Sequence, residues 1–138
     1  LNGRLDTMQA AILLAKWPYF DQEVTARARI GARYNDLLKD ACSVPTLRQG
    51  NTTVFAQYTI RSSDRNGLQD HLKKNDIPCA IYYPKCLHEQ PVFQEYGYLW
   101  GDLPEAERAS REVLSLPMHP WLSEEEQDQV VEKVKAYQ

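Results

Sequence analysis

The sequence predicts an α/β (α+β) fold in which helices pack on a small sheet, and three observations carry this prediction. Residues 54–62 alternate apolar and polar side chains, as a half-buried strand does. A helical pattern over residues 65–74 and a short apolar run, Cys79 to Ile81, follow it. Long helical patterns also open the chain. A strand, a helix and a strand in this compact order imply a crossover connection.

The N-terminal residues predict a helix that begins after Asp6, a good N-cap, and runs through TMQAAILLAK. The apolar residues of this stretch recur at spacings of three and four: Met8, Ala11, Ile12 and Ala15. Pro18 is expected to bend or break the helix and to bias Trp17 toward extended geometry.

A second amphipathic helix is predicted from Tyr19 to Ala41, roughly six turns at 3.6 residues each. Such a length suits a helix that crosses the whole domain or supports a neighbouring subunit. A long helix lying on its own sheet explains the same pattern. Beyond a loop from Cys42 to Thr53 and the strand, Ser63 or Asp64 is expected to cap the helix over residues 65–74.

The last third of the chain predicts short elements. Val92 to Trp100 is expected to form one or two helical turns, Pro104 to Val113 a helix, and Leu114 to Pro120 a brief strand. Ser123 and Glu126 make a capping box that opens a terminal helix. Three valines of that helix are expected to face inward: Val130, Val131 and Val134.

Composition narrows the function classes. The 138 residues, 43% apolar and 25% charged, predict a single soluble domain without a signal-like or membrane-length apolar run, hence a cytoplasmic protein. The net charge of -3 without a basic stripe argues against nucleic acid and membrane partners. The chain starts at Leu1 and has methionine only at Met8 and Met118, which indicates a piece of something longer.

The three cysteines are Cys42, Cys79 and Cys86, and their odd number argues against a disulfide framework. A zinc site could be drawn from Cys79, Cys86 and His88. Its spacing matches no common zinc finger, and a fourth ligand would have to come from far away. No metal site is therefore expected.

The stretch from Cys79 to Pro91, CAIYYPKCLHEQP, is the strongest candidate for a binding site. Polar groups follow the short apolar run where the chain must turn: Tyr82, Tyr83, His88 and Gln90. These groups could orient a ligand. Paired tyrosines at a strand end also cap cores, since a buried tyrosine needs only one hydrogen-bond partner.

The order of five motifs along the whole chain is distinctive: NGRLDTMQAAILLAK, YNDLL, AQYTIR, YYPKCLHEQP and LSLPMHPWLSEEE. It resembles the C-terminal part of the DegT/DnrJ/StrS family of pyridoxal-phosphate-dependent sugar aminotransferases. The resemblance implies that residues 1–138 form the small C-terminal domain of a fold-type I transferase, without the large cofactor-binding domain. It also implies a homodimer that moves an amino group from glutamate to a keto group of a nucleotide-linked sugar.

The resemblance assigns roles to individual residues. Asn2 matches an asparagine that reaches the cofactor phosphate of the neighbouring subunit, and Arg4 an arginine near the nucleotide-sugar phosphates. Tyr82 stands where family members commonly have histidine, so a sugar contact survives but proton transfer near neutral pH becomes doubtful.

Three further residues keep the family pattern and are expected near the substrate: Tyr83, His88 and Gln90. No lysine of this chain lies in the family's Schiff-base motif, and no catalytic residue is assigned. The chain alone is therefore expected not to transaminate. A stand-alone, non-catalytic binding or oligomerisation module derived from the same fold is the alternative.

Overall fold

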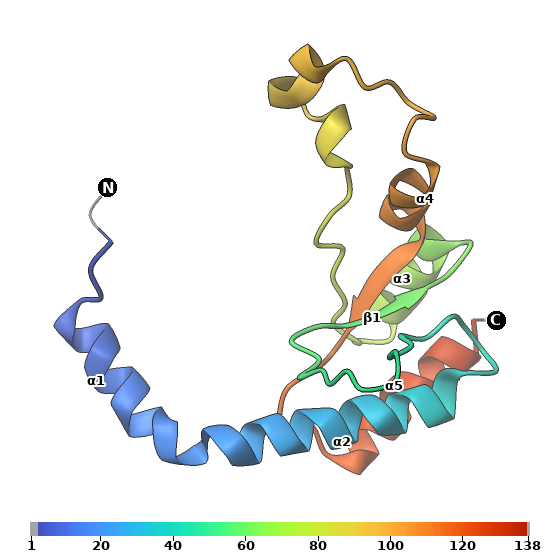
Figure 1. Cartoon of the computed structure of the whole chain (residues 1–138). Coiled ribbons are helices and arrows are strands. Elements are labelled where there is room, and N and C mark those ends of the chain that lie inside the picture. The colour runs from blue at the N-terminus through green and yellow to red at the C-terminus, as the bar shows by residue number, and fades with distance from the viewer. Residues whose placement is uncertain (1–2, 138) are drawn as a thin grey trace.

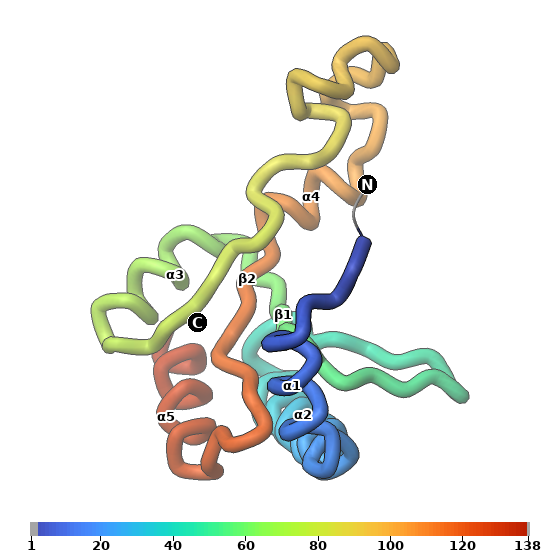
Figure 2. Tube along the Cα trace, turned by 90° about the vertical axis from the view of Figure 1, so that its left-hand side faces the viewer, coloured from blue at the N-terminus to red at the C-terminus, as the bar shows by residue number. Residues whose placement is uncertain are grey.

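The computed structural model describes residues 3–137 and shows helices packed on a small sheet, which confirms the predicted fold class (Figures 1 and 2). Figure 2 shows helices α3 and α5 together on one side of the strands, and the two helices are in contact. The elements of the body are α2 (Phe20–Leu38), β1 (Tyr58–Arg61), α3 (Arg65–Lys74), α4 (Pro104–Glu112), β2 (Val113–Leu116) and α5 (Glu124–Lys135).

Strand β2 pairs along both of its edges. Strand β1 pairs with β2 in antiparallel register, from Tyr58 opposite Leu116 to Arg61 opposite Val113. On the other edge of β2, Ala80 and Ser115 exchange two backbone hydrogen bonds of 3.0 and 2.8 Å, again antiparallel. Strand β1 and Ala80 therefore run in the same direction, and the predicted crossover through α3 is confirmed, with β2 between its two ends.

The prediction of a strand over Cys79 to Ile81 is wrong in extent, because only Ala80 pairs with the sheet. The prediction of a strand over residues 54–62 is also too long, since β1 begins at Tyr58. Phe55 has φ = 42°. That left-handed backbone interrupts the extended conformation that a strand requires.

The two N-terminal helices are joined rather than separated. Helix α1 (Thr7–Lys16) begins as predicted after Asp6, whose carboxylate accepts a hydrogen bond from Gln9 N at 2.9 Å. A 3-10 turn, Trp17–Tyr19, then leads into α2. The prediction of an extended Trp17 is wrong, because Pro18 occupies the first turn of the 3-10 segment, where its fixed φ suits a helix.

Two tyrosines from different elements meet at the centre of the core. The rings of Tyr34 on α2 and Tyr58 on β1 lie 4.8 Å apart. Tyr34 donates to the carbonyl oxygen of Pro117 at 3.2 Å, and Tyr58 donates to Asn35 Oδ1 at 2.6 Å. Burial raises the pKa of both phenols, so both stay protonated and keep these hydrogen bonds.

The terminal helix α5 closes the core as predicted. Ser123 and Glu126 form the capping box, with hydrogen bonds of 3.1 and 2.8 Å. The buried amide of Gln127 donates to the carbonyl oxygen of Ile30 on α2 at 2.8 Å. The three predicted valines are buried: Val130, Val131 and Val134.

Two parts of the chain project from this body in Figure 1. One is the N-terminal arm, residues 3–19, which contains α1. The other is the excursion, residues 82–103, which contains the 3-10 helices η2 (Leu87–Glu89) and η3 (Pro91–Tyr96). Within residues 3–137, no helix combines the length and apolar character needed to cross a membrane.

Candidate functional site

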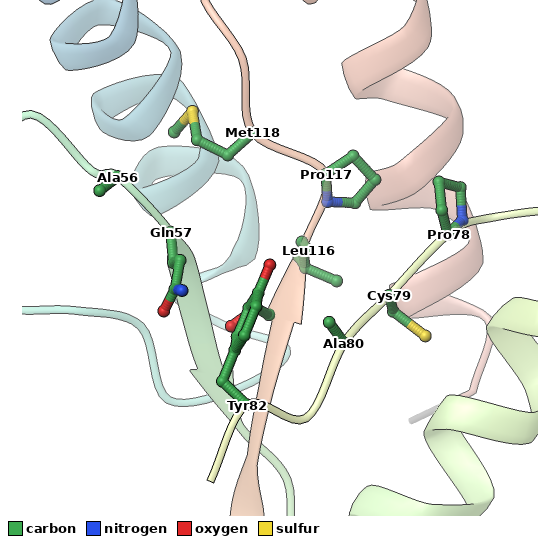
Figure 3. A pocket seen from close by; sticks show the side chains of 10 residues that line it. Ala56, Gln57, Pro78, Cys79, Ala80, Tyr82, Leu116, Pro117 and Met118 are labelled. Carbon is green, nitrogen blue, oxygen red and sulfur yellow. The ribbon is translucent and has the colours of Figure 1, made fainter. Parts of the chain in front are cut away.

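A hollow of about 220 Å³ lies where three segments meet at the sheet (Figure 3). The segments are residues 56–57 before β1, residues 78–82 after α3, and residues 115–118 at the end of β2. The hydrogen-bonded pair of Ala80 and Ser115 fixes the middle segment to β2. The hollow is lined by Ala56, Gln57, Pro78, Cys79, Ala80, Tyr82, Ser115, Leu116, Pro117 and Met118.

The exposed polar groups of this lining are the Gln57 amide and the Tyr82 phenol. The Ser115 hydroxyl already shares a hydrogen bond of 2.8 Å with the hydroxyl of Thr59. Burial raises the pKa of the Cys79 thiol, and this effect exceeds the opposing effect of Lys73. Cys79 is therefore a neutral thiol near pH 7 and a poor nucleophile.

The chemistry of the lining suits binding. An amide and a phenol both donate and accept hydrogen bonds, and the remaining lining is largely apolar. Pockets for whole small-molecule ligands measure roughly 300–1,000 Å³. The hollow is smaller than that, so it would hold one group of a larger ligand.

The lining does not fit covalently held pyridoxal phosphate. Covalent attachment needs a lysine, and the pyridinium nitrogen needs a facing carboxylate. The residues of the hollow include neither a lysine nor an acidic residue. Nothing in this hollow therefore anchors that cofactor.

The predicted site residues lie in different places. Tyr82 lines the hollow with 52% of its surface exposed, and the neighbouring Tyr83 points further into solvent, 74% exposed. Gln90 is half-buried at the end of η2. Arg4 is exposed on the N-terminal arm, which Figure 1 shows well apart from residues 82–90. Asn2 lies outside the described residues.

His88 is buried rather than open to the hollow. Its Nε2 lies 3.0 Å from Glu107 Oε1, and both side chains are about 5% exposed or less. Tyr82 and Tyr83 thus lie on one exposed segment, whereas His88 is buried against Glu107 of α4. The role of His88 in substrate contact stays a prediction.

Sequence reasoning did not single out Gln57 or Glu107. Gln57 carried a usable signal, since it belongs with Thr59 and Arg61 to the polar series of the predicted strand. Glu107 carried none, because an acidic residue in the first turn of a helix is ordinarily solvent-exposed. Within residues 3–137 no cluster of three metal-ligating side chains occurs.

Comparison with known proteins places the chain. Residues 1–135 match the DegT/DnrJ/EryC1/StrS aminotransferase family. The pleiotropic regulatory protein of Geobacillus stearothermophilus is 48% identical over 99% of this chain. The UDP-2-acetamido-2-deoxy-3-oxo-D-glucuronate aminotransferase of Pseudomonas aeruginosa is 40% identical over 88% of it. The matched regions are 38% and 33% of those two relatives.

Solved structures agree with the sequence matches. A DegT/DnrJ/EryC1/StrS aminotransferase from Brucella abortus superposes with a TM-score of 0.91 at 46% identity, over 97% of this chain and 36% of that one. NtdA from Bacillus subtilis, solved with bound cofactor PMP, superposes with a TM-score of 0.85 at 28% identity. The match covers 99% of this chain and 33% of NtdA. The chain therefore belongs to the DegT/DnrJ/EryC1/StrS aminotransferase family and spans about a third of the length of the relatives that it matches.

Proposed function

We propose that this chain is the C-terminal, substrate-binding part of a pyridoxal-phosphate-dependent aminotransferase that acts on a nucleotide-linked sugar, with glutamate as amino donor. Residues 1–138 form its small domain. Family membership supports this proposal, as does the relative named as a UDP-sugar aminotransferase. The proposal includes a cytoplasmic homodimer, in which each active site takes residues from both subunits.

The observation that carries the proposal is the hollow beside Tyr82. Its phenol and the Gln57 amide can each donate a hydrogen bond to one hydroxyl group and accept one from another. The Tyr82 ring adds an apolar face, and the apolar floor excludes water from that side of a sugar ring. Tyr82 is proposed to orient the sugar, with proton transfer left to other groups.

The remaining predicted residues complete the proposed substrate site. Arg4 supplies a permanent cation for the phosphates of the nucleotide, and Asn2 an amide donor for the cofactor phosphate of the partner subunit. Tyr83, His88 and Gln90 belong to the segment that borders the sugar. Arg4 lies on an arm apart from the hollow, which is consistent with a site completed by a second subunit.

Binding of UDP-N-acetylglucosamine, measured by calorimetry, tests the proposal. The Tyr82→Ala variant is expected to bind about tenfold more weakly, since it loses a hydrogen bond and a ring contact worth roughly 1–2 kcal/mol together. Tyr98→Ala is the matched control, because Tyr98 is equally exposed on the excursion and does not line the hollow. Equal affinities of wild type and Tyr82→Ala would refute the assignment.

The chain alone is proposed to lack transaminase activity. Supplied with pyridoxal phosphate, glutamate and a UDP-linked keto sugar, it should form no amino sugar, because its hollow lacks a Schiff-base lysine. Formation of the amino sugar would contradict the proposal.

A non-catalytic oligomerisation module is the second candidate, and the apolar surface of the N-terminal arm favours it. Several large apolar side chains there are exposed: Met8, Ile12, Leu13, Leu14 and Trp17. Association of the chain without saturable binding of UDP-N-acetylglucosamine would support this candidate over the first.

A further inference from the structure

Glu107 is a buried carboxylate to which two separate segments of the excursion are attached. Its Oε1 accepts hydrogen bonds from His88 at 3.0 Å, from Gly101 N at 2.8 Å and, more weakly, from Leu103 N at 3.4 Å. The residue is 3% exposed. A buried carboxylate is tolerated only when its oxygens are hydrogen-bonded, so these donors and Glu107 depend on one another.

These bonds connect the outgoing and returning parts of the excursion. His88 belongs to η2 on the outgoing part of the excursion, and Gly101 and Leu103 lie where the excursion returns to α4. One carboxylate oxygen of Glu107 on α4 therefore holds the outgoing and the returning segment of the excursion together. Figure 1 shows the outgoing segment rising from the sheet and the returning segment leading down into α4.

The same bonds fix one end of the Tyr82–Tyr83 segment. Its other end is fixed by the backbone pair of Ala80 with Ser115. Next to the second anchor, Cys86 N donates to Glu89 Oε2 at 2.9 Å, which stabilises the turn into η2. This segment is thus exposed but tied at both ends.

We infer that Glu107 is a positioning residue for the proposed substrate site, acting through His88 to hold the Tyr82–Tyr83 segment in place beside the hollow. The inference rests on the proposed function only for the assignment of the hollow as a substrate site. The hydrogen bonds to Glu107 that hold the Tyr82–Tyr83 segment do not depend on that assignment. Loss of the link leaves the sheet anchor at Ala80 intact. The core of the body should therefore stay folded while the segment loosens.

Fluorine NMR of the 138-residue chain labelled with fluorotyrosine tests this inference, with signals assigned by single Tyr→Phe variants. In Glu107→Ala, the signals of Tyr82 and Tyr83 should move toward the shift of free fluorotyrosine. The signals of the core residues Tyr34 and Tyr58 should not move. Unchanged Tyr82 and Tyr83 signals would overturn the inference, and so would equal changes at all four tyrosines.

Matched variants separate positioning from general stability. Glu105→Ala removes an exposed carboxylate of the same helix, which pairs with Arg108, and should leave all tyrosine signals in place. Glu107→Gln keeps an acceptor oxygen on a side chain of the same length and should keep the signals of Tyr82 and Tyr83 at their wild-type positions. Loss of those signals in Glu107→Gln but not in Glu107→Ala would also overturn the inference.

His88→Ala gives the answer if Glu107→Ala does not fold, because it removes one donor and leaves the carboxylate bonded to Gly101 and Leu103. His88→Ala should shift the Tyr82 and Tyr83 signals. Where Glu107→Ala does fold, amide hydrogen exchange at Gly101 should become about tenfold faster in that variant, as expected for a lost buried hydrogen bond. Unchanged Tyr82 and Tyr83 signals in His88→Ala would refute the inference. Failure to bind UDP-N-acetylglucosamine would refute the proposed function and leave these results unaffected.

Discussion

The body of the molecule and its two projections use apolar residues in opposite ways. In the body, apolar side chains from α2, α3, α5 and the sheet form one cluster with little or no exposure. On the N-terminal arm and the excursion, side chains of the same kinds are mostly more than half exposed. Examples on the excursion are Leu87, Val92, Tyr96, Leu99 and Trp100.

The difference shows which part of the fold the chain stabilises by itself. Burial of apolar surface contributes about 25 cal/mol per Å², so the cluster in the body supplies most of the free energy of folding. Exposed apolar residues on the projections contribute little to that free energy. Their conformation depends on local features such as caps, turns and the bonds to Glu107.

Truncation of one leucine in each region tests the comparison most strongly. Leu72→Ala, in the core of the body, should lower the free energy of unfolding by about 2–5 kcal/mol, because it leaves a cavity. Leu14→Ala, on α1, should change it by less than about 0.5 kcal/mol. Urea denaturation followed by fluorescence measures both, and equal losses would contradict the distinction.

Two glycines offer a similar pair with a smaller effect. A Cβ at Gly31 would overlap the ring of Phe55, so Gly31→Ala should destabilise the body by about 1–3 kcal/mol. Nothing lies within 4 Å of a Cβ at Gly3, and Gly3→Ala should be close to neutral. A neutral Gly31→Ala in the same urea measurement would mean that Phe55 can move aside.

The helix caps separate global from local stability. Ser123→Ala removes the side-chain cap of α5 and should cost about 1 kcal/mol of global stability. Asp6→Ala removes the corresponding cap of α1. It should lower helix content by circular dichroism without shifting the urea midpoint. A midpoint shift in Asp6→Ala as large as that in Ser123→Ala would show that α1 folds cooperatively with the body.

The smallest expected difference between the body and the excursion is in how their carboxylates affect the unfolding free energy at acidic pH. A hydrogen bond from the Ser123 backbone lowers the pKa of Glu126 below 4.5, and one from the Cys86 backbone does the same for Glu89. A lowered folded-state pKa stabilises the fold above the unfolded pKa, near 4.5, and this contribution is lost as pH falls through the lower, folded value.

Glu126 lies in the body and Glu89 on the excursion, so the two should differ. Glu126→Gln should flatten the decrease of unfolding free energy below about pH 4.5, whereas Glu89→Gln should leave it unchanged. Glu124→Gln, in the first turn of the same helix as Glu126, controls for the helix dipole. Equal flattening by all three variants would indicate a general charge effect.

Local signals made most elements predictable from the sequence. The caps at Asp6, Asp64 and Ser123 lie where predicted, because a cap depends on residues within one turn. The extent of the strands was not predictable, since it depends on pairing with β2 and on the left-handed backbone of Phe55. The prediction of an extended Trp17 was wrong because the effect of Pro18 depends on its position within a helical turn.

The candidate site also has residues that were predictable from local sequence and residues that were not. Tyr82 and Tyr83 were identified by sequence and lie on an exposed segment, with Tyr82 at the hollow. The approach of Gln57 to Tyr82 joins residues distant in sequence, and the burial of Glu107 under the excursion follows from tertiary packing. Neither relation leaves a periodic or local pattern for sequence reasoning to find.

A map of where a nucleotide sugar binds would test directly whether the hollow is the substrate site. Backbone amide NMR shifts of the isotope-labelled chain, followed during titration with UDP-N-acetylglucosamine, would locate the contact. The largest changes are expected at residues 56–57, 78–83 and 115–118, at and beside the hollow. Changes confined to other surfaces, or no change at saturating ligand, would contradict this assignment of the hollow.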